Sequence, residues 1–207
     1  MRELEVHPEC AFAYGHYRYV TADGSFLKQP KQHIATKDSY EKLLQGNLIA
    51  MHATVMYRRF AFESVGGFDT SLSSGEDWEH FLRVARKYPI CCYGNVVAEC
   101  RKHGTNMSLN YATMLSQSMA VLRSQQRHVK GNKRYERAIE SGVRTWREYY
   151  GKLLARKVLT NLRNRDWKQA MEDLPVLVRY YPEVFLHGCQ KLGSRYLRRW
   201  LRPSVRS

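Results

Sequence analysis

The stretch "GGFDTSLSSGEDWEHFLRVA", residues 66–85, contains three glycines, a serine-rich loop and a pair of adjacent acids where a helical pattern begins. From Gly75 onward, apolar residues recur at i, i+3, i+4 and i+7, which predicts one face of an amphipathic helix that ends near Lys87. These apolar residues are Trp78, Phe81, Leu82 and Ala85. The question is why two carboxylates, Glu76 and Asp77, stand at the start of this helix.

The local pattern around the acid pair has two explanations. Ser74, three residues before Asp77, makes a start that resembles a capping box, and acids in the first turn favour the helix dipole. A carboxylate in a first turn is also held firmly by its helix and can point into a cleft. There it can serve as the base that a hydroxyl needs when it attacks an electrophile. The residues nearby leave both explanations open.

Strands and helices alternate on either side of this helix. We expect a strand over 10–20, an Asp23-Gly24 turn that forms a hairpin with a second short strand, and a short helix over 38–45 capped by Asp38 or Ser39. A strand over 48–59, a short helix ended by Gly66-Gly67 and a strand over 90–103 complete the region. This mixture predicts an α/β domain over 1–110.

The pattern changes after residue 110. Strand-like runs give way to helical stretches at about 110–128, 132–164, 166–180 and 182–201, punctuated by Gly142, Gly151, Pro175 and Pro182. One pair of them resembles a helical hairpin of the tetratricopeptide type, without a clean second repeat. We therefore predict that 111–207 is a basic α-helical extension of the first region.

Charge divides the chain in the same way. Residues 1–110 carry a net charge of +1, whereas 111–207 carry +14. The last stretch interleaves arginines with Tyr196, Leu197 and Trp200, which is typical of an anchor at a membrane surface. We expect 195–206 to meet an anionic membrane surface, with a solvated basic face as the alternative. Nucleic-acid binding is a rival, although no nucleic-acid-binding signature is present.

Cysteine usage and hydropathy restrict the class of protein further. The five cysteines form no C-x-x-C pair, which argues against a zinc ribbon and against a disulfide framework, so we expect reduced, buried thiols. No apolar run has the length of a membrane-spanning helix, and the start has no signal-peptide core. A cytoplasmic protein, peripheral at the inner face of the cell membrane, is the expectation.

His103 is a further candidate, because it follows a strand and precedes a polar loop. A lone histidine is more often a loop or core residue, yet its neutral ring nitrogen is also a common metal ligand. The glycines at 66, 67 and 75 permit tight turns and close approach to a ligand. Taken singly, both signals are weak.

In this order and spacing the features resemble family 2 glycosyltransferases, which have the GT-A fold, an α/β sandwich that binds nucleotide sugars. The resemblance covers about 1–110. It rests on the Arg58-Arg59 pair after a strand, the "VGGFD" turn and the "EDW" that opens a helix. It also rests on the Tyr-Pro pair that ends this helix and on a final motif formed by Arg101, His103, Asn106 and Ser108. Upstream, "HPE", an apolar strand and a "DG" turn resemble the family's segment after its acidic metal-binding motif.

The resemblance implies roles for individual residues. Asp77 would be the base that deprotonates the acceptor hydroxyl, with inversion at the sugar carbon, and Glu76 would help shape the acceptor site. His103 would reach the metal and diphosphate. The substrate-binding set would comprise Gly66, Gly67, Gly75, Trp78 and Arg101, with Trp78 packing under the site or stacking on a sugar. A divalent cation, Mg²⁺ or Mn²⁺, would stabilise the leaving diphosphate.

The chain departs from the family in one respect: it contains no Asp-x-Asp, the motif that binds metal and ribose. We expect the N-terminal nucleotide-binding half to be absent and the chain to have no transferase activity by itself. The complete enzyme would use a nucleotide-sugar donor and a glycan or lipid-linked acceptor in polysaccharide or cell-envelope synthesis. The alternative is a non-catalytic basic protein, binding membrane or nucleic acid, that retains a GT-A-like half domain.

Overall fold

The computed structural model describes residues 2–30, 38–104 and 106–184. It divides into two compact units, Met1–Trp146 and Arg147–Ser207, and the division falls within helix α6. The elements, in chain order, are α1 (Arg2–Val6), β1 (Phe12–Val20), β2 (Phe26–Lys28), α2 (Ser39–Gln45), the 3-10 turn η1 (His52–Thr54), β3 (Val55–Tyr57), α3 (Arg59–Val65), α4 (Glu76–Ala85), β4 (Ile90–Arg101), the 3-10 turn η2 (Met107–Leu109), α5 (Tyr111–Val129), α6 (Lys133–Arg163) and α7 (Trp167–Tyr180).

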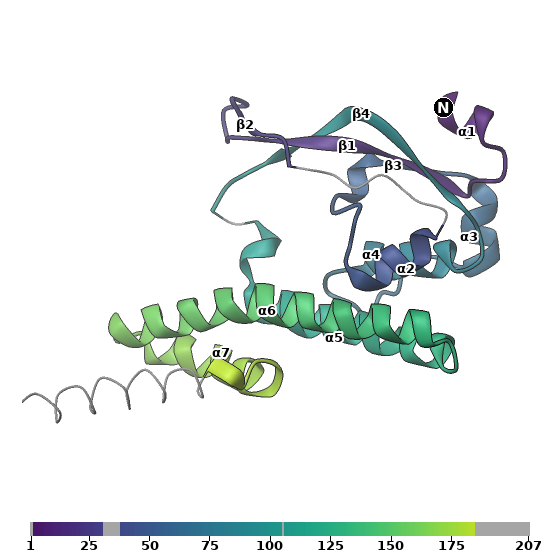
Figure 1. The fold of residues 1–207 in the computed structure, drawn as a ribbon. Coiled ribbons are helices and arrows are strands. Elements are labelled where there is room, and N and C mark those ends of the chain that lie inside the picture. Colours follow the sequence, from purple (N-terminus) through teal and green to yellow (C-terminus); the bar gives the residue numbers. More distant parts are fainter. Residues whose placement is uncertain (1, 31–37, 105, 185–207) are drawn as a thin grey trace, which may run out of the picture. The chain divides into compact units, whose positions relative to one another are not determined.

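The first unit is built on a mixed four-stranded sheet with β1 at its centre (Figure 1). On one side β1 pairs in parallel with β4, from Phe12 opposite Ile90 to Val20 opposite Arg101. On its other side β1 pairs antiparallel with β3 at one end and with β2 at the other. The prediction of an α/β fold followed by α-helices is therefore confirmed.

Helix α4 packs against the sheet through the face that the sequence periodicity predicts. The ring of Phe81 lies 5.4 Å from that of Phe12, centroid to centroid, and both side chains are fully buried. On another side of the helix, Trp78 donates from its indole nitrogen to the carbonyl oxygen of Leu43 in α2, at 3.0 Å. Helix α4 is thus held both by the sheet and by α2.

Helix α2 begins and ends as predicted. The Asp38 side chain caps it by accepting from the Glu41 amide at 3.0 Å, and Gly46 follows its last residue.

The prediction of a strand over 48–59 is mostly wrong. Asn47 accepts from the amides of Ile49 and Ala50, η1 follows, and within 48–59 the strand is limited to Val55–Tyr57. Local hydrogen bonding by Asn47 thus shortens a run that reads as a strand from composition alone.

Two cysteines also differ from the prediction. Cys10 and Cys91, predicted to be reduced thiols, form a disulfide with their Cα atoms 6.1 Å apart, within the usual range for a bridge. The parallel register places Cys91 opposite Ala13, three residues after Cys10. The pairing follows from this register and not from any spacing in the sequence. Cys92 and Cys100 remain thiols, and Cys189 lies outside the described residues.

The glycines that appeared to punctuate the second half do not interrupt a helix. α6 continues through both Gly142 and Gly151, and Pro175 lies inside α7. At Gly142 a Cβ atom would lie 2.1 Å from the Leu44 carbonyl oxygen, so this glycine is where α6 passes close to the end of α2. At Gly151 a Cβ would meet the ring of Tyr181. The predicted helix over 182–201 falls largely outside the described residues.

Gly142→Ala should destabilise the chain, although alanine is the better helix former. The propensity gain of about 1 kcal/mol is outweighed by the clash with backbone at Leu44, because overpacking costs about 1–3 kcal/mol and a carbonyl group has little freedom to move. We expect a lower free energy of unfolding in urea. The matched control is Ser141→Ala at the exposed neighbouring position, which should be neutral or slightly stabilising. A stabilising Gly142→Ala would contradict the close approach.

Candidate functional site

The acid pair stands at the start of α4, but the predicted capping box does not form. Gly75 is the N-cap, in the left-handed region at φ 78°, and no side chain caps the helix. Its carbonyl oxygen accepts from the Glu79 amide at 2.9 Å. Ser74 is buried, and its hydroxyl has no hydrogen-bond partner among the described residues. The positive φ at Gly75 turns the chain one residue later than a serine cap would require.

Asp77 is half-buried and electrostatically perturbed. Burial raises the pKa of its carboxyl above the ordinary value, and the neighbouring charge of Glu76 raises it as well. The Trp78 amide, which donates to Asp77 Oδ1 at 2.6 Å, and the nearby His52 both lower this pKa and so offset part of the effect. A carboxylate with a raised pKa is a better proton acceptor than an ordinary aspartate, which is the property that a general base needs.

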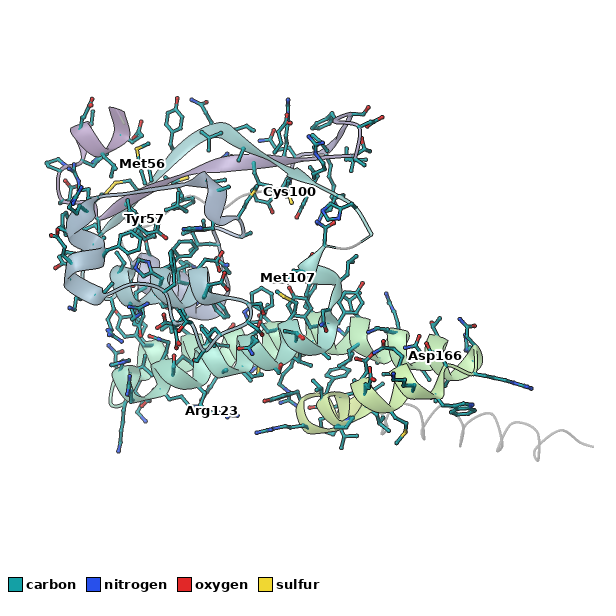
Figure 2. The ribbon with its side chains drawn as sticks, turned by 180° about the vertical axis from the view of Figure 1, so that it is seen from behind. Met56, Tyr57, Cys100, Met107, Arg123 and Asp166 are labelled. Carbon is teal, nitrogen blue, oxygen red and sulfur yellow. A yellow bond between two sulfur atoms is a disulfide. The ribbon has the colours of Figure 1, made fainter. Side chains whose placement is uncertain are left out.

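Two aromatic side chains lie beside Asp77 that the sequence did not single out. Tyr57, labelled in Figure 2, packs its ring against those of Phe12 and Phe81, with ring centroids 5.2 and 6.4 Å away. Burial, and then the charge of Asp77, raise the pKa of Tyr57 well above its ordinary range. The exposed ring of His52 lies 5.9 Å from that of Tyr57. The Tyr57 hydroxyl is buried and has no hydrogen-bond partner in the described part of the chain.

The glycine turn is fastened to α4 by a buried histidine. His80 is fully buried and packs against Phe62, with ring centroids 4.7 Å apart. Its Nε2 lies 3.2 Å from the carbonyl oxygen of Gly66, which itself has a φ of 81°. Burial, with the nearby charge of Arg83, lowers the pKa of His80 to about 4, so the imidazole is neutral at physiological pH. A neutral ring that carries its proton on Nε2 donates a hydrogen bond to the Gly66 carbonyl oxygen. His80 lies about one turn of α4 beyond Asp77.

Arg83 makes a second set of hydrogen bonds that hold the glycine turn against α4. Arg83 Nε contacts both carboxylate oxygens of Glu79, at 2.9 and 2.8 Å. Its two other nitrogens donate to the carbonyl oxygens of Val65 and of Gly67, the latter at 2.6 Å. The turn at Gly66-Gly67 is therefore held by the helix that carries the acid pair, through His80 and Arg83, which follow Asp77 by three and six residues.

Trp78 lies beneath this site. Its side chain is only 2% exposed, and its ring is 5.5 Å from that of Trp146, so the structure gives it a packing role. Direct stacking of Trp78 on a sugar stays a prediction.

The structure does not bring Arg101 and His103 to the same place as the acids. Arg101 pairs with Val20 at the hairpin end of β1 and donates to the Ala22 carbonyl oxygen at 3.1 Å. The loop after it is closed by Asn106, which accepts from the His103 amide at 2.7 Å and donates to the Arg101 carbonyl oxygen at 3.1 Å. Phe12, which packs on α4, lies at the other end of β1.

A divalent cation finds no complete ligand set in the described residues. No group of three His, Cys, Asp or Glu side chains there is placed to hold a metal ion. His103 is exposed, and its Nε2 lies 3.3 Å from the side-chain nitrogen of Asn106. The described residues therefore do not fit a metal site by themselves, and the chemistry that can be derived from them runs through the carboxylates.

A cavity of about 720 Å³ lies against β1, β3 and β4. Its lining includes Gly15, Met56 and Tyr93, together with the segment between His52 and Tyr57, but none of the predicted site residues. Met56 and Tyr57 are consecutive in β3, so their side chains leave the strand on opposite faces, Tyr57 toward Phe81 in α4.

Asp77→Asn should stabilise the folded chain at neutral pH. Because the folded state raises the pKa of Asp77, ionisation of this carboxylate costs folding free energy at every pH above that pKa. Below the ordinary value of 3.8 the group is protonated in both states and the cost vanishes. The advantage of the variant should therefore be absent in acid, grow as the pH rises through the raised pKa, and then level off. We expect about 0.5–2 kcal/mol, as is common for single stabilising substitutions.

Urea unfolding of both proteins across pH 3–8 measures this difference. Asp69→Asn is the matched control, because Asp69 is exposed and hydrogen bonds from Ser71 lower its pKa, so its substitution should destabilise instead. An advantage of Asp77→Asn that is the same at all pH values would show that burial does not perturb the carboxyl.

Comparison with known proteins and families identifies the family of the chain. A search of curated proteins finds no match. The model of a family described as "Glycosyltransferase like family 2" matches residues 1–152, which takes in the sheet, the acid pair, α5 and part of α6. The match passes the boundary predicted at residue 110, and that boundary stays a prediction. Since the match covers most of the chain, the protein belongs to glycosyltransferase-like family 2.

Proposed function

We propose that the chain supplies the acceptor side of an inverting glycosyltransferase. The donor is a nucleotide sugar, the acceptor is a glycan or a lipid-linked glycan, and the setting is polysaccharide or cell-envelope assembly. The observation that carries the proposal is Asp77, a half-buried carboxylate with a raised pKa at the start of α4, in a chain of the glycosyltransferase-like family.

The chemistry assigned to Asp77 is a single displacement. The acceptor oxygen forms a bond to the anomeric carbon while the bond from that carbon to the diphosphate oxygen breaks, and the nucleoside diphosphate leaves with the electron pair. Asp77 takes the acceptor proton. One displacement inverts the anomeric configuration, and it needs only a base positioned on the acceptor side.

Neighbouring residues support this role. Glu76 raises the pKa of Asp77 and so increases its basicity. Gly66 and Gly67 expose backbone at a turn fixed by His80 and Arg83, which suits close approach by a ligand. Arg101 and His103 keep their proposed contacts with substrate and metal as expectations from the family resemblance.

The second candidate is a non-catalytic binding protein that retains this domain. It is favoured by the net charge of +14 over 111–207, which attracts anionic partners whether or not Asp77 performs chemistry. The predicted membrane contact through 195–206 belongs to either candidate and lies outside the described residues.

Asp77→Asn, introduced at the chromosomal copy of the gene, separates the two candidates. We expect loss of the glycan product by about 10²–10⁴-fold, the usual contribution of a general base, with the protein still present at normal abundance. Mass spectrometry of the cell-envelope glycans measures the product, and immunoblotting measures the protein. Asp69→Asn, an exposed carboxylate in the preceding loop, is the control and should leave the product unchanged. Normal product in the Asp77→Asn strain would exclude the proposed base.

The purified chain 1–207 should not turn over nucleotide sugars by itself. It contains no Asp-x-Asp, and its described residues supply no metal-binding group of three. Release of nucleoside diphosphate from UDP- and GDP-sugars in the presence of Mg²⁺ or Mn²⁺ is the measurement. Sustained release above the protein-free rate would contradict this expectation.

A further inference from the structure

Helix α7 in the second unit has an apolar stripe that faces outward. Its buried side packs Ala170, Asp173 and Leu177 inside the unit. Trp167, Met171 and Val178 stand at i, i+4 and i+11 and are 60%, 61% and 49% exposed. At 100° per residue these three positions fall within about 40° of one another, so they form one stripe about 16 Å long.

Exposure on this scale calls for an explanation. Single exposed apolar residues are normal, but an aligned set that includes a tryptophan marks a contact surface. The helix itself is firmly placed within its unit. Asp166, labelled in Figure 2, caps α7 by accepting from the Gln169 amide at 3.2 Å, and Asp173 is paired with Lys157 of α6 at 2.9 Å. The stripe is therefore a stable feature of a hairpin formed by α6 and α7.

Cations outnumber acids beside the stripe, where Asp166, next to Trp167, and Glu172, next to Met171, are the exposed acids. Arg163 and Arg165 lie in the turn that leads to Trp167, Lys168 follows it, and Arg179 follows Val178, all exposed. On α6, Lys152, Arg156, Leu159 and Arg163 recur at i, i+4, i+7 and i+11 and are likewise exposed. Over 147–207 the sequence has 14 Lys/Arg and 5 Asp/Glu.

The charge restricts what can cover the stripe. The remaining segment 185–207 has six Lys/Arg and no acid, so it would bring like charge to a basic surface. A nucleic acid would satisfy the cations but leave Met171 and Val178 uncovered. An anionic bilayer offers both parts of the match, since phosphates meet the cations while the acyl boundary accepts the apolar stripe, and tryptophan prefers that interface.

We propose that the α6–α7 hairpin is a peripheral membrane-binding module. Trp167, Met171 and Val178 enter the interfacial layer of an anionic bilayer, and Arg163, Arg165, Lys168 and Arg179 meet its phosphates. No helix among the described residues has the length and apolarity to cross a membrane, which agrees with binding at the surface. The proposed membrane binding does not depend on transferase activity, and it is measured without sugars.

The test is co-sedimentation of the full chain with large vesicles of phosphatidylcholine containing about 30% phosphatidylglycerol. We expect binding that weakens as salt rises, little binding to pure phosphatidylcholine, and at least a roughly tenfold lower partition coefficient for Trp167→Ser/Met171→Ser. Met107→Ser is the matched control, since Met107 is 62% exposed in the first unit, and it should bind normally. Circular dichroism checks that the variants keep their helices.

A second measurement locates the contact by fluorescence. Vesicle binding should shift the tryptophan emission to the blue, and Trp167→Phe, which keeps an aromatic ring at the position, should remove more of that shift than Trp200→Phe. Three outcomes would overturn the proposal: equal binding to uncharged vesicles, binding that survives Trp167→Ser/Met171→Ser but is lost in Arg198→Ser/Arg199→Ser, or retention on duplex DNA without vesicle binding.

Discussion

The packing of α4 between the sheet and α2 is the contact on which the candidate site depends. Phe81 meets Phe12 at the start of the central strand β1, while Trp78 reaches the Leu43 carbonyl from the adjacent side of the helix. Asp77 immediately precedes the second of these anchors, so its backbone has little freedom. Partial burial then raises the pKa of its carboxyl, and a packing arrangement thereby sets the chemistry of the first turn.

The same helix also determines the conformation of the loop before it. His80 and Arg83 hold the backbone at Gly66 and Gly67, the histidine from a fully buried position. A histidine charged at neutral pH would be repelled by the Arg83 guanidinium, whereas the neutral ring is not. The acid pair and the glycine turn therefore behave as one rigid part, which favours a preorganised acceptor site.

Local sequence patterns predicted the elements that depend on local rules. The 3.6-residue period over 75–87 located α4, the Asp23-Gly24 turn located the hairpin, and Asp38 marked the start of α2.

Features that depend on distant residues were missed. The disulfide from Cys10 to Cys91 follows from strand register, and Gly142 serves a helix crossing. Tyr57 and His52 reach Asp77 only once β3 lies over α4. The capping box failed because Gly75 at positive φ ends the loop, which composition alone does not reveal.

The bond between Cys10 and Cys91 has a consequence for the integrity of the site. It closes a loop of the chain that includes α2, β3, the glycine turn and both acids. A protease that cuts anywhere between these cysteines leaves the two pieces covalently attached, and they separate only after reduction. The segment that carries the proposed base thus remains tethered to the central strand after a single backbone break.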